Sequence, residues 1–188
     1  MKVVVLSSSI VGTKTKIALE KTVGIARQKY EDAEVTFLDL ADYDLPFSDG
    51  RVYFEYEGDA KYVTETLMAA DAIVIGFPVF QASIPATLKN IFDLLPIGAL
   101  LNKVVSMVVT AGSAKHYLIA EQQLKPILSY MKATIVPTYV FIEEQDFLKG
   151  EIVNDDILFR LERLVEDTVN TVEATQFLIE KQNEMYDF

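Results

Sequence analysis

Residues 72–95 read AIVIGFPVFQASIPATLKNIFDLL, and this stretch decides the fold. It opens with a nearly all-apolar run, Ala72–Gly76, which is typical of a parallel strand buried on both faces. A helical pattern follows, with Pro85 expected at the first helical position and Ser83 as its N-cap. The loop between them, Phe77–Ser83, leaves the carboxyl end of the strand, where open α/β sheets bind their ligands.

This loop presents groups suited to a flat ligand with polar edges. Phe80 offers an aromatic face, Gln81 an amide and Ser83 a hydroxyl, on a backbone that Pro78 stiffens. A purely structural loop is more often short and built of turn residues. We therefore predict a binding loop made of Pro78, Val79, Phe80, Gln81 and Ser83.

A second loop of interest follows the first predicted strand, Lys2–Leu6. Ser7–Thr15 is rich in hydroxyls and leads into a helical pattern, so backbone N–H groups, the helix dipole and hydroxyl donors meet as in a phosphate cradle. With Gly12 as its one glycine, the loop is neither a Walker A loop nor a GxGxxG turn, which favours a monophosphate over a pyrophosphate. An ordinary capped helix start explains the same residues, and the loop alone leaves both readings open. The residues predicted to hold a phosphate are Ser9, Thr13 and Thr15.

The rest of the chain continues the alternation of strands and helices. Further strands are predicted at 34–38, 103–110 and 133–142, and further helices at 61–70, at 116–132 and after Asn154. Pro126 predicts a kink or a widened turn within its helix, and Pro137 predicts an edge strand or a bulge. The pattern predicts one α/β domain over residues 1–188, doubly wound and flavodoxin-like, with a five-stranded parallel sheet.

The long connection 40–59 is the least regular part of the chain. It carries five aromatic residues, Tyr43, Phe47, Tyr53, Phe54 and Tyr56. They suit a stacking platform for a ring. The favoured reading is that they pin the connection to the body or to a partner subunit.

Composition excludes several classes of function. A formal net charge of −11 argues against nucleic acid or an anionic membrane surface as a partner. The chain has no cysteine, no apolar run long enough to span a membrane, and no signal-peptide pattern, so we expect a cytoplasmic protein. His116 is the single histidine and no Gly-x-Ser-x-Gly elbow exists, which excludes a Ser-His-Asp triad. No histidine and carboxylate pair shares a helix face, so no metal site is predicted.

Residues 78–93 resemble the second flavin-contacting loop of the NADPH-dependent FMN reductase family, Pro-x-Tyr-Asn-x-Ser-x-Pro-x-x-Leu-Lys-Asn-x-x-Asp. The departures are Phe80 for tyrosine and Gln81 for asparagine. The family's first loop resembles the stretch beginning at Ser8-Ser9, with Val11 where the family usually has an arginine associated with NADPH. Lys14 is the residue here that offers a replacement charge. By this resemblance the small polar loop at the end of the fourth strand lines the flavin ring edge, which adds Thr110, Ala111, Gly112, Ser113 and His116 to the predicted site.

Over residues 1–145 the chain is similar to the reductase component of two-component alkanesulfonate monooxygenases. The matching motifs include Leu94-Leu95-Pro96 and Leu124-Lys125-Pro126-Ile127-Leu128. Those reductases often have an aromatic residue or histidine near Gln122, associated with a widened helical turn at the subunit interface. The similarity implies a homodimer or homotetramer and a possible monooxygenase partner.

The resemblance implies an NAD(P)H:FMN oxidoreductase, with FMN and NADPH or NADH as cofactors. The flavin carries the hard chemistry, so no catalytic side chain is expected. Two alternatives stay open: an azo- or quinone reductase with bound FMN, and a flavodoxin-like electron carrier. Whether FMN is a substrate that leaves or a tightly held group also stays open.

Overall fold

The computed structural model describes residues 1–186, so the last two residues of the predicted domain lie outside the described part. Its main sheet is parallel throughout and has the strand order β2-β1-β3-β4-β5, with β6 also paired to β4. This is the flavodoxin-like order, so the predicted fold class is confirmed. The strands are β1 (Lys2–Ser7), β2 (Glu34–Asp39), β3 (Ala72–Pro78), β4 (Val104–Ala111), β5 (Thr134–Ile135) and β6 (Val140–Glu143).

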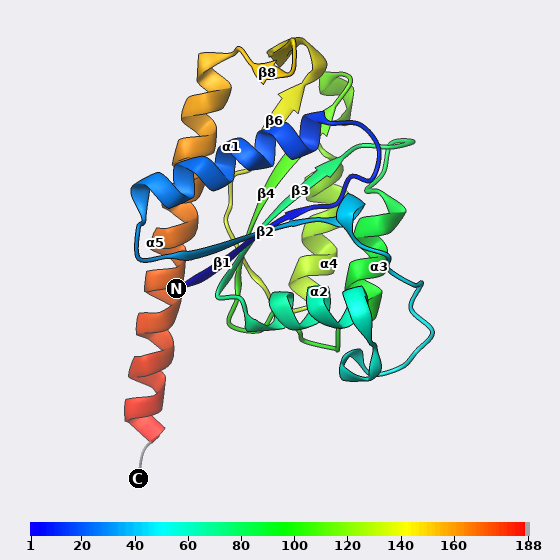
Figure 1. Cartoon of the computed structure of the whole chain (residues 1–188). Coiled ribbons are helices and arrows are strands. Elements are labelled where there is room, and N and C mark those ends of the chain that lie inside the picture. The colour runs from blue at the N-terminus through cyan, green and yellow to red at the C-terminus, as the bar shows by residue number, and fades with distance from the viewer. Residues whose placement is uncertain (187–188) are drawn as a thin grey trace.

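Helices cover both faces of this sheet (Figure 1). The helices are α1 (Lys14–Lys29), α2 (Gly58–Ala69), α3 (Ala86–Leu94), α4 (Lys125–Tyr130) and α5 (Asp155–Tyr186). Alternate strand residues face opposite ways: Val5 and Val74 pack with α1 and α5, whereas Leu6 and Ile75 pack with the other three helices. None of the described helices is long and apolar enough to cross a membrane.

The packing of α1 against the sheet depends on one close contact, between Leu19 and Gly76. Gly76 of β3 pairs with Ser7 of β1, near the carboxyl ends of both strands. A Cβ atom at Gly76 would lie under 3.0 Å from three side-chain atoms of Leu19 on α1, and Leu19 is fully buried. Glycine is therefore needed so that α1 can lie against β3 at this point.

The last strand of the sheet is broken, as Pro137 predicts. β5 and β6 are two short pieces on either side of this proline, and both pair with β4 at the edge of the sheet. Proline cannot donate to the ladder, so pairing stops there and resumes at Val140. An unpredicted antiparallel hairpin, β7 (Phe147–Leu148) and β8 (Glu151–Ile152), follows β6.

The predicted helix 116–132 is wrong as one continuous α-helix. A 3₁₀ turn (Ala114–His116) comes first, followed after a gap by a π-helical segment (Ala120–Leu124) that leads into α4. The predicted widened turn is confirmed. A proline ring clashes with the carbonyl four residues earlier, here that of Gln122, and a π turn moves this carbonyl away.

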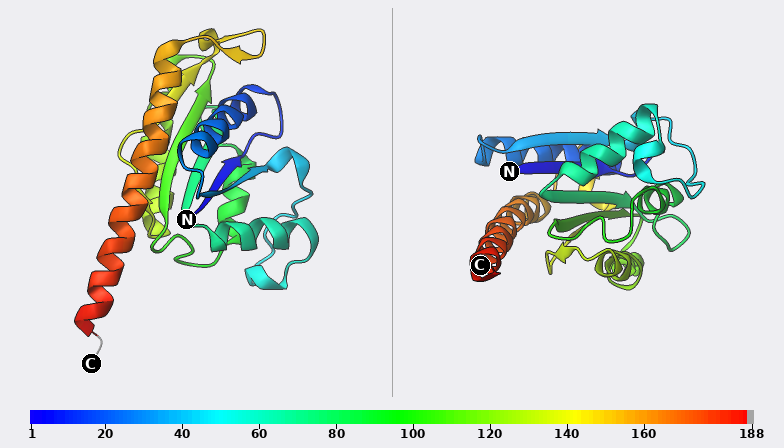
Figure 2. Two further views of the ribbon diagram at one scale, coloured as in Figure 1. Left: turned by 60° about the vertical axis from the view of Figure 1, so that its left-hand side comes forward. Right: turned by 90° about the horizontal axis from the view of Figure 1, so that it is seen from below.

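Two predicted helix caps have different outcomes. Asn154 does cap α5, because its Oδ1 accepts a hydrogen bond from the Asp156 N–H at 3.0 Å. The cap predicted at Ser83 is wrong: Pro85 occupies the N-cap position of α3. The hydroxyl of Ser83 instead donates to Oε1 of Gln123 at 2.6 Å. α5 then continues beyond the sheet as a single protruding helix (Figure 2).

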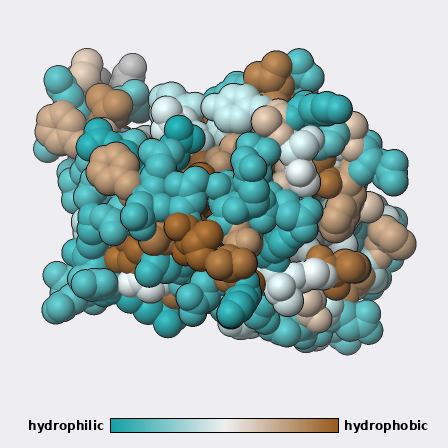
Figure 3. Space-filling model, turned by 90° about the horizontal axis from the view of Figure 1, so that it is seen from above, coloured by the Kyte–Doolittle hydropathy of each residue, from teal (hydrophilic) through white to brown (hydrophobic). Residues whose placement is uncertain are grey.

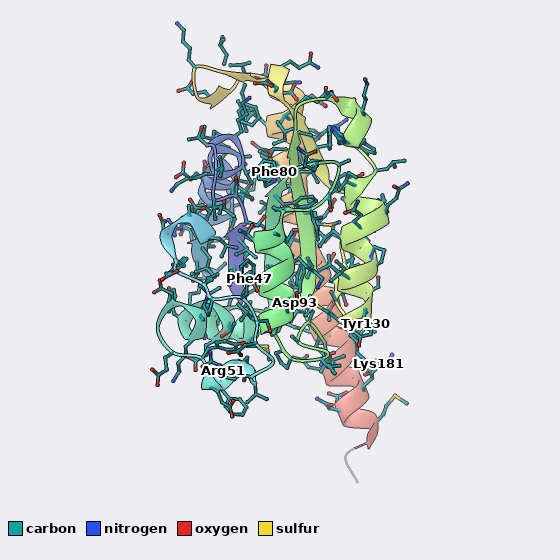
Figure 4. The ribbon with its side chains drawn as sticks, turned by 90° about the vertical axis from the view of Figure 1, so that its right-hand side faces the viewer. Phe47, Arg51, Phe80, Asp93, Tyr130 and Lys181 are labelled. Atoms are coloured by element: carbon teal, nitrogen blue, oxygen red, sulfur yellow. The ribbon has the colours of Figure 1, made fainter. Side chains whose placement is uncertain are left out.

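The connection 40–59 is docked on α3. Asn90 Oδ1 accepts from the Ser48 N–H at 3.0 Å, and its Nδ2 donates to the Pro46 carbonyl at 2.9 Å. Phe47 is 82% exposed and lies well away from Phe80 in Figure 4. The structure therefore supports the reading of a pinned connection over that of a stacking platform.

Replacing Gly76 by alanine should destabilise the protein by about 1–3 kcal/mol, because the buried Leu19 has no room to yield. Gly24 is the matched control, since it lies in α1 with open space around the position of a Cβ. Gly24→Ala should stabilise by up to about 1 kcal/mol through helix propensity. Chemical denaturation of both variants measures the difference, and an unchanged midpoint for Gly76→Ala would contradict the packing argument.

Candidate functional site

A cavity of about 350 Å³ opens at the carboxyl ends of β1, β3, β4 and β6. The three predicted loops meet in it, and a fourth segment, residues 142–147, also lines it. The predicted site residues that line the cavity are Ser9, Thr13, Lys14, Thr15, Pro78, Val79, Phe80, Thr110, Ala111 and Gly112. Figure 3 shows hydrophobic groups among hydrophilic ones on the upper surface of the molecule.

The phosphate cradle has the features that an anion needs. Thr13 is the N-cap of α1, and its side chain makes no capping hydrogen bond. The first N–H groups of the helix are thus left without a side-chain cap beside the cavity, at the positive end of the helix dipole. Gly12 has φ +80°, a left-handed conformation that glycine adopts without strain. The Ser9 hydroxyl donates to the Val11 carbonyl at 2.6 Å and fixes the turn of this loop.

Thr15 lines the cavity and also makes a contact within the protein. Its side chain is buried, and its hydroxyl lies 2.6 Å from that of Thr110 at the end of β4. The two threonines therefore hold the first loop against the third, whereas Thr13 is exposed beside the cavity.

Charge at the cavity is paired. Lys14 Nζ lies 2.5 Å from Glu144 Oε1, and the two side chains are 43% and 70% exposed, respectively. The neighbouring ammonium lowers the pKa of the Glu144 carboxyl below its usual value. Lys14 is the one cation and Glu144 the one anion among the residues that line the cavity.

Phe80 stands at one corner of a tight, strained turn. Phe80 and Ser83 exchange two backbone hydrogen bonds, of 3.1 and 2.9 Å. The two residues between them, Gln81 and Ala82, have φ +48° and +57°. Non-glycine residues in this region cost about 1–3 kcal/mol each, and such strain collects at functional sites. Asparagine tolerates the left-handed region better than glutamine does, which gives a backbone reason for the family's asparagine at position 81.

The π-helical segment holds this turn from the other side. Gln123 accepts from the Ser83 hydroxyl at 2.6 Å and donates through Nε2 to the Ala82 carbonyl at 3.1 Å. The widened helix thus carries a side chain that satisfies both partners on the turn. Sequence reasoning missed Gln123, because nothing local links it to a turn some 40 residues earlier.

Four predicted site residues do not line the cavity. Gln81 is exposed at the tip of the turn, and Ser83 is occupied by Gln123. Ser113 and His116 lie beyond the end of β4, at and within the 3₁₀ turn, away from the lining. Five lining residues were missed. Val11 and Gly12 belong to the first loop, and the other three are Ile142, Glu144 and Phe147. These three lie at or after the carboxyl end of the last predicted strand, so the rule that located the other loops also points to this segment.

A parallel sheet of this order with a ligand cavity at its strand ends defines a flavodoxin-like α/β protein. Residues 1–147 match the NADPH-dependent FMN reductase family, and the chain belongs to that family. The predictions of an oxidoreductase, and of FMN and a nicotinamide as its cofactors, are confirmed by this membership.

Individual relatives agree with the family. The chain is 39% identical over 171 residues to an NAD(P)H-dependent FAD/FMN reductase of Geobacillus thermodenitrificans, covering 90% of this chain and 92% of the relative. It is 26% identical to the NADH-dependent FMN reductase SfnF of Pseudomonas fluorescens, covering 86% of each chain. The apo structure of the NADH:FMN oxidoreductase EmoB superposes with a TM-score of 0.76 at 22% identity, over 89% of this chain and 87% of that one, which shows the shared fold.

Gln123→Met should loosen the turn, because methionine has a similar length but makes neither hydrogen bond. We expect the free energy of unfolding to fall by about 1–2 kcal/mol. FMN-dependent NAD(P)H oxidation should fall about tenfold or more, since a misplacement of about 1 Å can reduce a rate by about 100-fold. Gln122→Met, an exposed position on the same π-helical segment, is the matched control. Equal stability and equal turnover in the two variants would show that the turn does not depend on Gln123.

Proposed function

We propose that this cavity is where the chain reduces FMN with NADH or NADPH. The observation that carries the proposal is the N-terminus of α1, which lacks a side-chain cap and opens beside the same cavity as the aromatic face of Phe80. The uncapped helix N-terminus suits a phosphate, and the aromatic face of Phe80 suits a flat ring. The residues present therefore fit FMN.

Within this proposal each loop has one task. Thr13 and the first backbone N–H groups of α1 hold the phosphate, and Lys14 lies beside it. Phe80 packs on the ring, and the backbone at Ala111 and Gly112 borders its edge. When bound, FMN supplies the hydride-accepting chemistry, whereas the protein orients the ring and limits its contact with water.

Val11 bears on whether the chain prefers NADPH over NADH. It is 68% exposed at the rim of the cavity and stands where the family usually has an arginine. An aliphatic side chain cannot make the bidentate contact that an arginine makes with a phosphate. We therefore expect the 2′-phosphate of NADPH to add little binding energy at this position, so that the chain also accepts NADH as its reductant.

The final acceptor separates this function from its alternatives. A reductase that releases reduced FMN oxidises NAD(P)H in proportion to added flavin. An azo- or quinone reductase needs a second acceptor and retains its flavin. An electron carrier of the flavodoxin type shows no nicotinamide turnover with any acceptor. Steady-state assays with flavins, quinones and azo dyes distinguish the three.

The remaining parts of the proposal concern assembly and setting. We propose one domain over residues 1–188 and a cytoplasmic location. From the resemblance to the reductase component of two-component alkanesulfonate monooxygenases, we also propose a monooxygenase that receives the reduced flavin. A homodimer or homotetramer is supported by large apolar side chains exposed near α3 and α4. They are Phe80, Ile97, Leu101, Tyr117, Leu118 and Tyr130.

Thr13→Ala should weaken FMN binding by about 10- to 100-fold, because the hydroxyl makes a charge-assisted hydrogen bond to the phosphate. Riboflavin, which lacks the phosphate, should bind equally well to the variant and the parent. Flavin fluorescence titration measures both affinities, with Thr66→Ala on α2 as the control. An unchanged FMN affinity would remove Thr13 from the phosphate site.

Light scattering at micromolar concentration should give the mass of a dimer or a tetramer, because the apolar groups around α3 and α4 would otherwise face water. Tyr130→Glu, which places a charge on a side chain that is 72% exposed, should shift the mass towards the monomer if this face is the interface. A monomeric mass for the parent protein would contradict the assembly.

A further inference from the structure

The Lys14–Glu144 pair sits where the phosphate cradle needs positive charge. Lys14 is the second residue after Gly12, at the start of α1, and it is the one cation among the lining residues. Its ammonium is already within 2.5 Å of a carboxylate oxygen. Lysine and glutamate together therefore bring no net charge to a site that must hold a phosphate.

Local contacts hold the backbone of Glu144 in place independently of its ion pair with Lys14. Glu144 begins a 3₁₀ turn (Glu144–Asp146) whose ends are tied by a capping box, in which Asp146 accepts from the Glu143 N–H at 2.8 Å. Asn154 donates to the other oxygen of Asp146 at 2.7 Å, so this turn is also fixed to the start of α5. The backbone of Glu144 thus stays at the rim of the cavity. If the flavin phosphate pairs with Lys14, the Glu144 carboxylate loses its partner and stays on the same side of the cavity as the phosphate dianion.

We propose that Glu144 weakens the hold of the site on the flavin phosphate and thereby makes FMN an exchangeable substrate instead of a tightly bound prosthetic group. This inference rests on the proposed function, because it assumes that the phosphate lies at the start of α1. Like charges a few ångströms apart repel, and near a protein surface the repulsion is only partly screened by water and salt. A lysine without this partner would bind the phosphate with its full charge.

The test compares Glu144→Gln with the parent protein in binding FMN and riboflavin to the apo-protein. Glutamine keeps the shape of glutamate and removes its charge. FMN should bind about three- to tenfold more tightly to the variant at low salt, whereas the affinity for riboflavin should stay the same. The gain for FMN should shrink as the salt concentration rises towards about 1 M, because screening removes the repulsion.

Two controls make the result specific. Glu151→Gln removes one negative charge from β8, outside the cavity lining, and should leave FMN affinity unchanged if the effect is local. In a Lys14→Met background, Glu144→Gln should still raise the affinity for FMN and leave the affinity for riboflavin unchanged, because the Glu144 carboxylate repels the phosphate even when the lysine is absent.

The same proposal predicts the rate at which FMN is lost. Passage through a desalting column should remove FMN faster from the parent than from Glu144→Gln.

The outcomes separate this inference from the proposed function. Weaker FMN binding by Glu144→Gln would overturn the inference, because Glu144 would then position Lys14 for the phosphate instead of competing with it. An equal affinity of the parent and the variant for FMN would overturn it as well. If the parent protein discriminates FMN from riboflavin in either case, the phosphate site itself stands. Failure to discriminate the two flavins would instead count against the site at α1.

Discussion

The whole site depends on how closely α1 lies against the sheet. Leu19 packs directly over Gly76, and this contact allows the helix to approach β3 without an intervening side chain. The hydrogen bond between Thr15 and Thr110 then fixes the first turn of the helix to the end of β4. Because both contacts lie at the carboxyl end of the sheet, the N-terminus of α1 is held beside the loops that follow β3 and β4. A helix one side chain further out would leave its N–H groups away from the cavity.

Strain on the opposite wall is balanced by contacts from another part of the chain. The turn 80–83 places two non-glycine residues in the left-handed region and presents Phe80 to the cavity. Gln123 supplies two hydrogen bonds to that turn from a helix that is widened next to Pro126. The helical irregularity and the strained turn are therefore parts of one arrangement. In the proposed function, the face of Phe80 that packs on the flavin ring is therefore positioned by contacts from outside its own loop.

Electrostatics at the site are local, as they must be in a protein with a net charge of −11. The helix dipole and uncapped backbone donors act over a few ångströms, whereas surface charges more than a Debye length of about 10 Å away are largely screened by salt. The single lysine of the cavity is paired with Glu144, so most of the attraction for a phosphate comes from backbone groups. In the proposed function, such a site distinguishes FMN from riboflavin by hydrogen bonding to the phosphate more than by charge.

Local patterns in the sequence determined the order of strands and helices, the flavodoxin-like class, the edge strand at Pro137, the widened turn before Pro126 and two of the loops that line the cavity. These features follow from hydrophobic periodicity, from proline chemistry and from the rule that ligands lie at the carboxyl ends of parallel strands. Only the tertiary structure decided which of the predicted side chains are paired with distant residues of the chain. It buried Thr15 against Thr110, joined Ser83 to Gln123 and brought Glu144 to Lys14. Each of these pairs joins residues at least 40 positions apart, and a pairing of that kind is fixed by packing, which no local pattern in the sequence records.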